Sequence, residues 1–278
     1  MNNETTLITG ASSGIGMHLA HEFARNGHRV ILVAPVESEL REVAQQLQTN
    51  GGGEAIVIAK DLEQPNAPQE IFDELQQRGV SVDILVNNAG HGQHGNFWEI
   101  PLEKDLSMMR LNMEAMLRLM KLFLPPMLAR KRGRILNNAS VGGFEPGPMI
   151  AVYHATKAFV LSLTQALATE LEDSGITVTA LCPGPTDTDF FPKADMMATR
   201  AFQHAMPPQD VAKAGYDAVM KGDRLVVPGG MNKALVFARR FMTEGGQAKM
   251  NEKMMEELAE GDRKYDRGDM ETKAAQKD

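Results

Sequence analysis

Residues 5–16 read Thr5-Thr6-Leu7-Ile8-Thr9-Gly10-Ala11-Ser12-Ser13-Gly14-Ile15-Gly16, and this segment indicates the fold class of the chain. Its first five residues form a short apolar run, which is typical of a strand buried on both faces of a parallel sheet. The residues that follow place apolar side chains at helical spacing, at Leu19, Ala20, Phe23 and Ala24. A strand, a glycine-rich turn and a helix in this order predict the first unit of an α/β protein.

The three glycines of the turn have separate tasks. Gly10 permits a tight turn, Gly14 lets the backbone approach a pyrophosphate, and Gly16 lets the helix pack closely against the strand. The free N–H groups at the start of the helix then favour a phosphate. A purely structural turn is the alternative, because glycines also occur in turns that bind nothing. We expect a dinucleotide site here, formed by Gly10, Ser12, Ser13, Gly14, Ile15 and Gly16.

Short runs rich in Val, Ile and Leu alternate with helical stretches along the rest of the chain. The expected strands are residues 5–9, 29–34, 55–59, 83–87, 134–138, 177–182 and 225–227. The expected helices are residues 14–26, 37–49, a segment after Pro65 or Pro68, 102–130 and 151–173. This alternation predicts an α/β fold with a Rossmann-type doubly wound parallel sheet in three layers. Residues 1–243 are expected to form this single domain.

Residues 244–278 differ in composition and are expected to form a polar, charged tail outside the core, helical or partly disordered. They contain many Met, Glu and Lys residues and few large apolar side chains. Just before them, Leu235, Ala238, Phe241 and Met242 share one helical face. Packing against the body or a partner subunit is favoured over a membrane surface for this face, because the segment is short and only weakly basic.

The overall composition excludes several classes of protein. The 278 residues include 29 Lys and Arg against 36 Asp and Glu, and a net charge of −7 with no basic run disfavours nucleic-acid binding. Cys182 is the single cysteine, so an intramolecular disulfide cannot form. The N-terminus lacks the features of a signal peptide, and no apolar run approaches the roughly 20 residues of a membrane span. A cytoplasmic location is therefore expected.

Several motifs follow the glycine-rich turn in a fixed order. Each lies at the end of an expected strand or on the helix after it: Asn87-Asn88-Ala89-Gly90, Asn112, Ser140, Tyr153 with Lys157, and Pro183-Gly184 with Thr188. Together with the Gly-x-x-x-Gly-x-Gly turn, this set resembles the short-chain dehydrogenase/reductase (SDR) family of the Tyr-x-x-x-Lys type, over about residues 5–230. The resemblance implies an enzyme that acts on CH–OH groups with NAD or NADP as cofactor.

Tyr153 and Lys157 are the expected proton donor and the group that tunes it. Residues four apart on a helix project from one face, with Cβ atoms roughly 5–6 Å apart. A free tyrosine has a pKa of about 10, and a nearby cation lowers that pKa by favouring the phenolate. A Tyr and a Lys at this spacing also occur on many surface helices. The surrounding motifs therefore support the interpretation more than the pair itself does.

The resemblance implies roles for the other catalytic residues. Ser140 would hydrogen-bond the substrate oxygen, and Asn112 would support a proton relay from Lys157 through water. Lys157 would also bind the nicotinamide ribose. His91 and His94 have no clear third ligand near them, so no metal site is expected, and we expect both to line the substrate entrance.

Residues at the ends of the second and third strands bear on the choice of cofactor. Ala34-Pro35-Val36 offers neither an acid for a ribose 2′-hydroxyl nor an arginine for a 2′-phosphate. Nothing there repels a phosphate, so NADP is slightly favoured over NAD. By resemblance, Asp61 and Leu62 contact the adenine. The expected cofactor site is completed by Asn88, Ala89, Gly90, Tyr153, Lys157, Pro183, Gly184, Thr186 and Thr188.

The expected function is hydride transfer between a nicotinamide cofactor and a carbonyl or alcohol, with Tyr153 as general acid and base. A nucleotide-sensing regulator and a non-redox lyase or epimerase on the same fold are the alternatives. The presence of Ser140, Tyr153 and Lys157 argues against the sensor, and the glycine-rich turn argues against the lyase. Apolar side chains within residues 142–149 and 190–208 indicate an apolar small-molecule substrate, such as a lipid-like, steroid-like or acyl carbonyl. A homodimer or homotetramer is expected.

Overall fold

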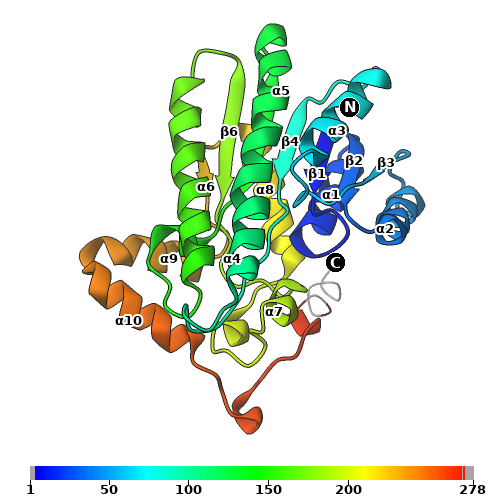
Figure 1. The fold of residues 1–278 in the computed structure, drawn as a ribbon. Helices are drawn as coiled ribbons and strands as arrows, with labels where there is room; N and C mark the ends of the chain where they lie inside the picture. Colours follow the sequence, from blue (N-terminus) through cyan, green and yellow to red (C-terminus); the bar gives the residue numbers. More distant parts are fainter. Residues whose placement is uncertain (1–3, 271, 273–278) are drawn as a thin grey trace.

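The strands lie side by side in a parallel sheet (Figure 1). The structure is a computed structural model that describes residues 4–270 and 272. Within this part of the chain the strands are β1 (Thr5–Thr9), β2 (Arg29–Ala34), β3 (Ile56–Ala59), β4 (Ile84–Asn87), β5 (Gly133–Asn138), β6 (Ile176–Leu181) and β7 (Leu225–Val226). Their order across the sheet is β3-β2-β1-β4-β5-β6-β7, and every neighbouring pair is parallel. The predicted doubly wound sheet is confirmed.

β1 lies between β2 and β4 in the sheet. Leu7 pairs with Ile31 of β2 and with Leu85 of β4, and all three side chains are fully buried. From β1 the chain builds the sheet first toward β3 and then, after β3, in the opposite direction from β4 onward. The carboxyl ends of β1 and β4 therefore mark the point where ligands bind in sheets of this kind.

Helices cover both faces of the sheet and complete three layers. One face carries α1 (Gly14–Arg25), α2 (Glu37–Thr49) and α8 (Pro208–Lys221). The other face carries α3 (Ala67–Gln77), α4 (Leu102–Met109), α5 (Met116–Arg130) and α6 (Ala151–Glu170). Each layer buries its own apolar cluster against the strands, so the sheet is apolar on both sides, as its continuous apolar runs predict.

The helix expected over residues 102–130 is divided by a π-helical segment, Arg110–Ala115. Asn112 lies in this segment and is almost fully buried, and its amide bonds to atoms outside its own helix. A π-helical turn holds one extra residue and often occurs at functional positions. Apolar periodicity alone does not reveal it, because the helical pattern continues on both sides.

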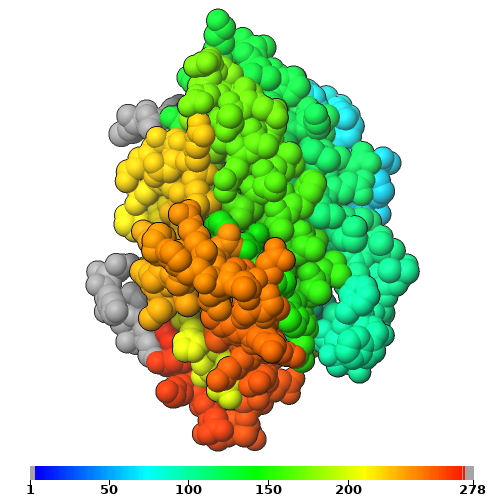
Figure 2. All heavy atoms as spheres, turned by 90° about the vertical axis from the view of Figure 1, so that its left-hand side faces the viewer, coloured from blue at the N-terminus to red at the C-terminus, as the bar shows by residue number. Residues whose placement is uncertain are grey.

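Three further helices gather at the carboxyl end of the sheet: α7 (Phe190–Lys193), α9 (Gly230–Ala238) and α10 (Glu244–Met255). We call residues 190–204 together with residues 230–270 the cover. In Figure 2, the orange residues of the cover spread over the lower part of the molecular surface in view. Within the described residues, none of the helices combines the length and the apolar character that a bilayer crossing requires.

The expectation that residues 244–278 lie outside the core is wrong for α10. Met255 is buried in a cluster with Phe191 and Phe202. Asn251 Nδ2 donates to Pro146 O at 2.8 Å, which ties the helix to the loop before α6. The polar composition of α10 conceals this because only one side of the helix, with Gln247, Asn251 and Met255, is buried. The domain boundary at residue 243 stays a prediction, and residues 271 and 273–278 lie outside the described part.

The apolar face expected on the segment before α10 is partly exposed. Leu235 is 46% exposed and Phe241 80% exposed, whereas Val236 packs against the main core. Arg239 stacks on the Phe144 ring with its guanidinium carbon 4.4 Å from the ring centroid. Val236 and Arg239 thus anchor the segment to the body in the described chain.

Candidate active site

The glycine-rich turn joins β1 to α1 with backbone angles that favour glycine. Gly10 has φ +64° and Gly14 has φ +54°. A Cβ on Gly16 would lie 2.1 Å from Gly10 O, so helix and turn approach more closely than any side chain allows. The Ser13 side chain makes no capping hydrogen bond to α1. The first N–H groups of α1 are therefore not satisfied by that side chain, which is the arrangement that favours an anion.

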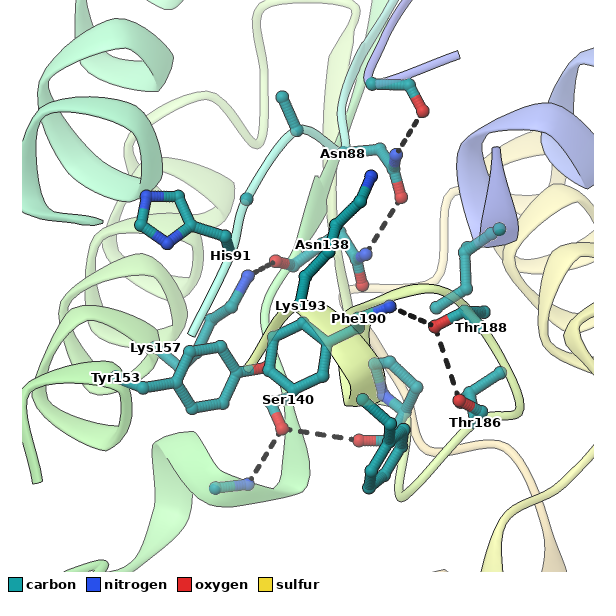
Figure 3. Close-up of a pocket in the computed structure, with 18 of the residues that line it drawn as sticks. Asn88, His91, Asn138, Ser140, Tyr153, Lys157, Thr186, Thr188, Phe190 and Lys193 are labelled. Carbon is teal, nitrogen blue, oxygen red and sulfur yellow. Dashed lines mark hydrogen bonds between the residues drawn. The ribbon is translucent and has the colours of Figure 1, made fainter. Parts of the chain in front are cut away.

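A hydrogen-bonded network holds the carboxyl ends of β1, β4 and β5 together. Thr9 Oγ1 accepts from the backbone N–H of Asn88 and of Ala89, each at 3.0 Å. Asn88 Nδ2 donates to Thr9 O at 3.0 Å, and Asn138 Nδ2 donates to Asn88 Oδ1 at 2.9 Å. Three neighbouring strand ends are fixed in this way, so the motif residues become one wall of a cavity (Figure 3).

Tyr153 and Lys157 face this cavity from α6, with Ser140 opposite them at the end of β5 (Figure 3). Lys157 Nζ lies 5.6 Å from the Tyr153 ring centroid and donates to Asn138 O at 2.7 Å. Ser140 Oγ accepts from Gly142 N at 3.1 Å. The Phe190 ring of α7 lies 5.1 Å from the Tyr153 ring between centroids. The predicted donor, its neighbouring cation and the hydroxyl group thus meet beside an apolar wall.

Burial dominates the electrostatics of the Tyr153–Lys157 pair. It raises the pKa of the Tyr153 phenol to about 12, and a hydrogen bond with the Ser140 side chain opposes that rise. Burial also lowers the pKa of the Lys157 ammonium to about 8. The expectation that Lys157 lowers the pKa of Tyr153 is not met in the protein chain alone. The low polarity around both groups disfavours both charged forms more than the single cation favours a phenolate.

Asn112 clamps the loop after β4 from behind the cavity. Its Oδ1 accepts from His91 N at 3.1 Å, and its Nδ2 donates to His91 O at 2.9 Å and to Thr156 Oγ1 at 3.1 Å. The side chain is 2% exposed and does not line the cavity. Its amide positions the loop that carries Gly90, while its part in a proton relay stays a prediction.

The two histidines of this loop occupy different surroundings. His91 lines the cavity, and its Nε2 lies 3.0 Å from Ser107 Oγ. His94 is buried, and its Nε2 lies 3.1 Å from Met255 O at the end of α10. The sequence predicted that His94 lines the substrate entrance. This prediction is wrong, because α10 covers His94. Among the described residues no group of acids, histidines or cysteine is arranged to hold a metal ion.

The loop after β6 closes the cavity beside the glycine-rich turn. Thr186 Oγ1 donates to Gly184 O at 2.9 Å, and Thr188 Oγ1 donates to Thr186 O at 3.3 Å. A Cβ on Gly14 would lie 3.1 Å from the Thr188 side chain. Thr188 is thus in near contact with the turn. A glycine at position 14 leaves the space between the turn and Thr188 free.

Most of the predicted site residues line one cavity of about 550 Å³. They are Gly10, Ser12, Ser13, Gly14, Ile15, Asp61, Leu62, Asn88, Ala89, Gly90, Ser140, Tyr153, Lys157, Pro183, Gly184, Thr186 and Thr188. Gly16 and Asn112 lie behind it and act through packing and loop position. The sequence reasoning missed Asn138, Lys193 and the α10 residues Met250, Met254 and Met255. The position of Asn138 at a strand end could have revealed it, but no sequence signal links α10 to this cavity.

The cavity fits a nicotinamide dinucleotide. The close backbone contact at Gly16 and the uncapped start of α1 form a cradle for phosphates. Asn138 Oδ1 is buried in the lining and accepts no hydrogen bond from the described residues, so it can receive a donor from a ligand. At the adenosine end the lining includes Ala34, Val36 and Lys60, but the Lys60 ammonium already pairs with Glu70.

Comparisons with known proteins agree with this geometry. Residues 4–198 match the family described as short chain dehydrogenase. An uncharacterized oxidoreductase of Staphylococcus saprophyticus is 33% identical over 221 residues, which cover 80% of this chain and 93% of that protein.

Two solved structures extend the likeness. The short-chain dehydrogenase from Sphingobium yanoikuyae in complex with NADPH is 33% identical, with a TM-score of 0.76 over 86% of this chain and 94% of that one. The bulky-bulky ketone specific alcohol dehydrogenase from Comamonas testosteroni is 31% identical, with a TM-score of 0.73 over 87% and 94% of the two chains. The family match ends at residue 198, so α9 and α10 of the cover lie beyond it.

Proposed function

Because the chain belongs to the short chain dehydrogenase family, we propose that Tyr153 exchanges a proton with the oxygen of a carbonyl or alcohol substrate held between Ser140 and α7. The protein is an NAD(P)-dependent oxidoreductase.

Each residue near Tyr153 has a separate part in this reaction. The nicotinamide, when bound, supplies or accepts the hydride. Ser140 holds the substrate oxygen through its hydroxyl group, and Tyr153 donates its phenolic proton to that oxygen during reduction. Lys157 places a cation beside the phenol and stabilises the negative charge that develops on the phenolic oxygen. A neutral phenol is the required form for donation, and the raised pKa of Tyr153 keeps it neutral near pH 7.

One observation supports the proposal above the others. Tyr153, Lys157 and Ser140 come from two different elements, yet they line the same cavity as the glycine-rich turn. A nucleotide sensor would need the turn but no proton donor beside it. A lyase would need the donor but no dinucleotide cradle.

The substrate class follows from the cover. Phe190, Phe191, Met196, Met254 and Met255 line the cavity and carry no charge. We infer a bulky, mainly apolar carbonyl or alcohol, a class that also includes the bulky ketones named for the Comamonas relative. We also infer NADP as the favoured cofactor, a homodimer or homotetramer, and a cytoplasmic location.

The test is turnover by Tyr153→Phe. This change removes only the phenolic oxygen, so we expect oxidation of NADPH with a panel of apolar ketones to fall by about 10²–10⁴-fold, while NADPH binding is kept. Tyr216→Phe is the matched control, because Tyr216 Oη lies 3.3 Å from His28 Nε2 in another layer of the fold. Wild-type turnover in Tyr153→Phe would reject the role given to this tyrosine.

A further inference from the structure

Lys193 is a cation in the cavity that the reaction described above does not use. It is the last residue of α7, it is exposed, and it lines the cavity. Figure 3 shows its side chain extending past Phe190 toward Asn88 rather than toward the Tyr153 ring. We propose that Lys193 binds the diphosphate of the dinucleotide from the side of Thr188, next to the glycine-rich turn. This inference rests on the proposed function, since it assumes that the dinucleotide occupies this cavity.

The position of α7 supports the assignment. Thr188, two residues before α7, lies beside Gly14, where an added Cβ would come within 3.1 Å of its side chain. Phe190 N donates to Thr188 Oγ1 at 3.4 Å, so the start of α7 is tied to that threonine. Lys193 N donates to Asp189 O at 3.2 Å, which closes the helical turn. The backbone path therefore carries Lys193 from the glycine-rich turn back over the cavity.

Among the described residues, the carboxylates nearest to Lys193 in the sequence bind other groups and form no ion pair with its ammonium group. Arg267 Nη1 lies 3.3 Å from Asp187 Oδ1, and Arg267 Nε lies 3.1 Å from Asp189 Oδ1. Asp187 also accepts from the backbone N–H of Gly268 at 2.9 Å and of Met270 at 3.0 Å. Asp195, the next acid after Lys193, accepts from Gln93 Nε2 at 2.9 Å.

These contacts place a positive charge of the C-terminal part of the cover beside Asp187 and Asp189. Two acids beside Thr186 and Thr188 would repel a diphosphate, and Arg267 compensates them. Within the part of the chain that the structure describes, no acid forms an ion pair with Lys193. A lysine without a carboxylate partner, aimed into a cavity, acts as a point charge for phosphate.

The diphosphate is favoured over the other phosphate of NADP. The ribose 2′-phosphate would lie at the ends of β2 and β3, where Ala34, Val36 and Lys60 line the cavity. Lys193 comes instead from the side of Thr188 and Gly14, at the start of α1. Since NAD and NADP share the diphosphate, Lys193 should contribute equally to the binding of both.

The test compares Lys193→Gln and Lys193→Arg with Lys213→Gln as a matched surface control. Lys213 lies on α8 and its side chain is 67% exposed. Dissociation constants of NADPH and NADH are measured on the full chain by fluorescence titration, at low and at high salt. Lys193→Gln should raise both constants by the same factor, about three- to tenfold, and flatten their salt dependence. Lys193→Arg should restore most of the affinity, and Lys213→Gln should match wild type.

The other outcomes each overturn the assignment. A loss confined to NADPH would place the 2′-phosphate at Lys193. Unchanged dinucleotide affinity, with a raised KM for a carboxylated ketone and an unchanged KM for a neutral one, would make an anionic substrate its partner. Unchanged values throughout would leave Lys193 without a ligand. If wild-type protein bound neither dinucleotide, the proposed function itself would fail, and that result is separate from any effect of Lys193.

Discussion

The two walls of the cavity are built from different kinds of residue. On the side of the sheet, Gly10, Gly16 and Thr9 bring backbone atoms into contact, and an added Cβ at Gly16 would meet Gly10 O at 2.1 Å. On the side of the cover, flexible or broad apolar side chains such as Met254 and Phe191 form the wall. The first wall tolerates no extra atom, whereas the second can adapt by changing rotamers. We therefore expect the sheet wall to determine cofactor and chemistry, and the apolar side chains of the cover to determine substrate, while Lys193 is the one residue of the cover to which we assign cofactor binding.

The largest effect should come from Lys157→Met on the sheet side. This change keeps much of the side-chain volume but removes the charge beside Tyr153 and the hydrogen bond to Asn138 O. We expect kcat to fall by about 10²–10⁴-fold, because the charge that develops on the phenolic oxygen loses its stabilising cation. Steady-state kinetics with NADPH and an apolar ketone measure this. Lys213→Met controls for the loss of a surface charge, and a kcat within threefold of wild type would show that Lys157 is not needed for the chemistry.

Gly16→Val tests the close packing of the same wall. A side chain at this position must push α1 away from the turn and displace the N–H groups that would hold the phosphates. We expect the dissociation constant of NADPH to rise by about 10–100-fold, because one hydrogen bond to a charged group contributes roughly 1.5–3 kcal/mol. Gly53→Val is the matched control, since no atom lies within 4 Å of an added Cβ there. Equal affinities for the two variants would show that the turn does not form the phosphate cradle.

Met255→Ala tests the cover. Met255 is 8% exposed and packs in the cluster of Phe191 and Phe202, so truncation should lower the free energy of unfolding by about 2–3 kcal/mol. Met231→Ala, where the side chain is 74% exposed, should change it by no more than about 0.5 kcal/mol. Urea denaturation measures both values.

The KM for bulky ketones should rise in Met255→Ala while NADPH affinity stays unchanged, and a large loss of NADPH affinity would contradict the division between the two walls.

The smallest effect should be a pH dependence that comes from Lys157. Burial lowers its pKa from 10.5 to about 8, so between these values the unfolded chain binds more protons and stability rises with pH. Relative to Lys157→Met, the wild-type protein should therefore gain about 1.4 kcal/mol in the free energy of unfolding from pH 7 to pH 9. Urea denaturation without cofactor at the two pH values measures the gain. A constant difference between the two proteins would mean that Lys157 is not buried as a charged group.

Much of the sheet side was predictable because its signals are local. The run Thr5–Thr9 and the three glycines after it predict strand, turn and helix within twelve residues. The carboxyl ends of parallel strands meet at one edge of a sheet, so the sequence alone predicts that Asn88 and Ser140 lie together. The pKa of Tyr153 could not be predicted in this way. Spacing shows that Lys157 is near, but not how much protein surrounds both groups.

The cover was harder to predict because its contacts join distant parts of the chain. α10 is mostly polar, and its few buried residues meet partners more than a hundred positions away, as Asn251 does at Pro146 and Met255 at His94. For the same reason, no pattern near His94 in the sequence could predict that α10 covers this histidine.

Local sequence patterns were enough to predict the α/β fold, the glycine-rich turn and the Tyr153–Lys157 pair, because each depends on residues only a few positions apart. Three positions follow only from the folded structure: that of α10 at the cavity, that of Arg267 on Asp187 and that of Lys193 at the cavity lining. These positions arise when apolar and charged groups far apart in the chain are buried together. The free energy of such burial depends on neighbours that a linear pattern does not contain.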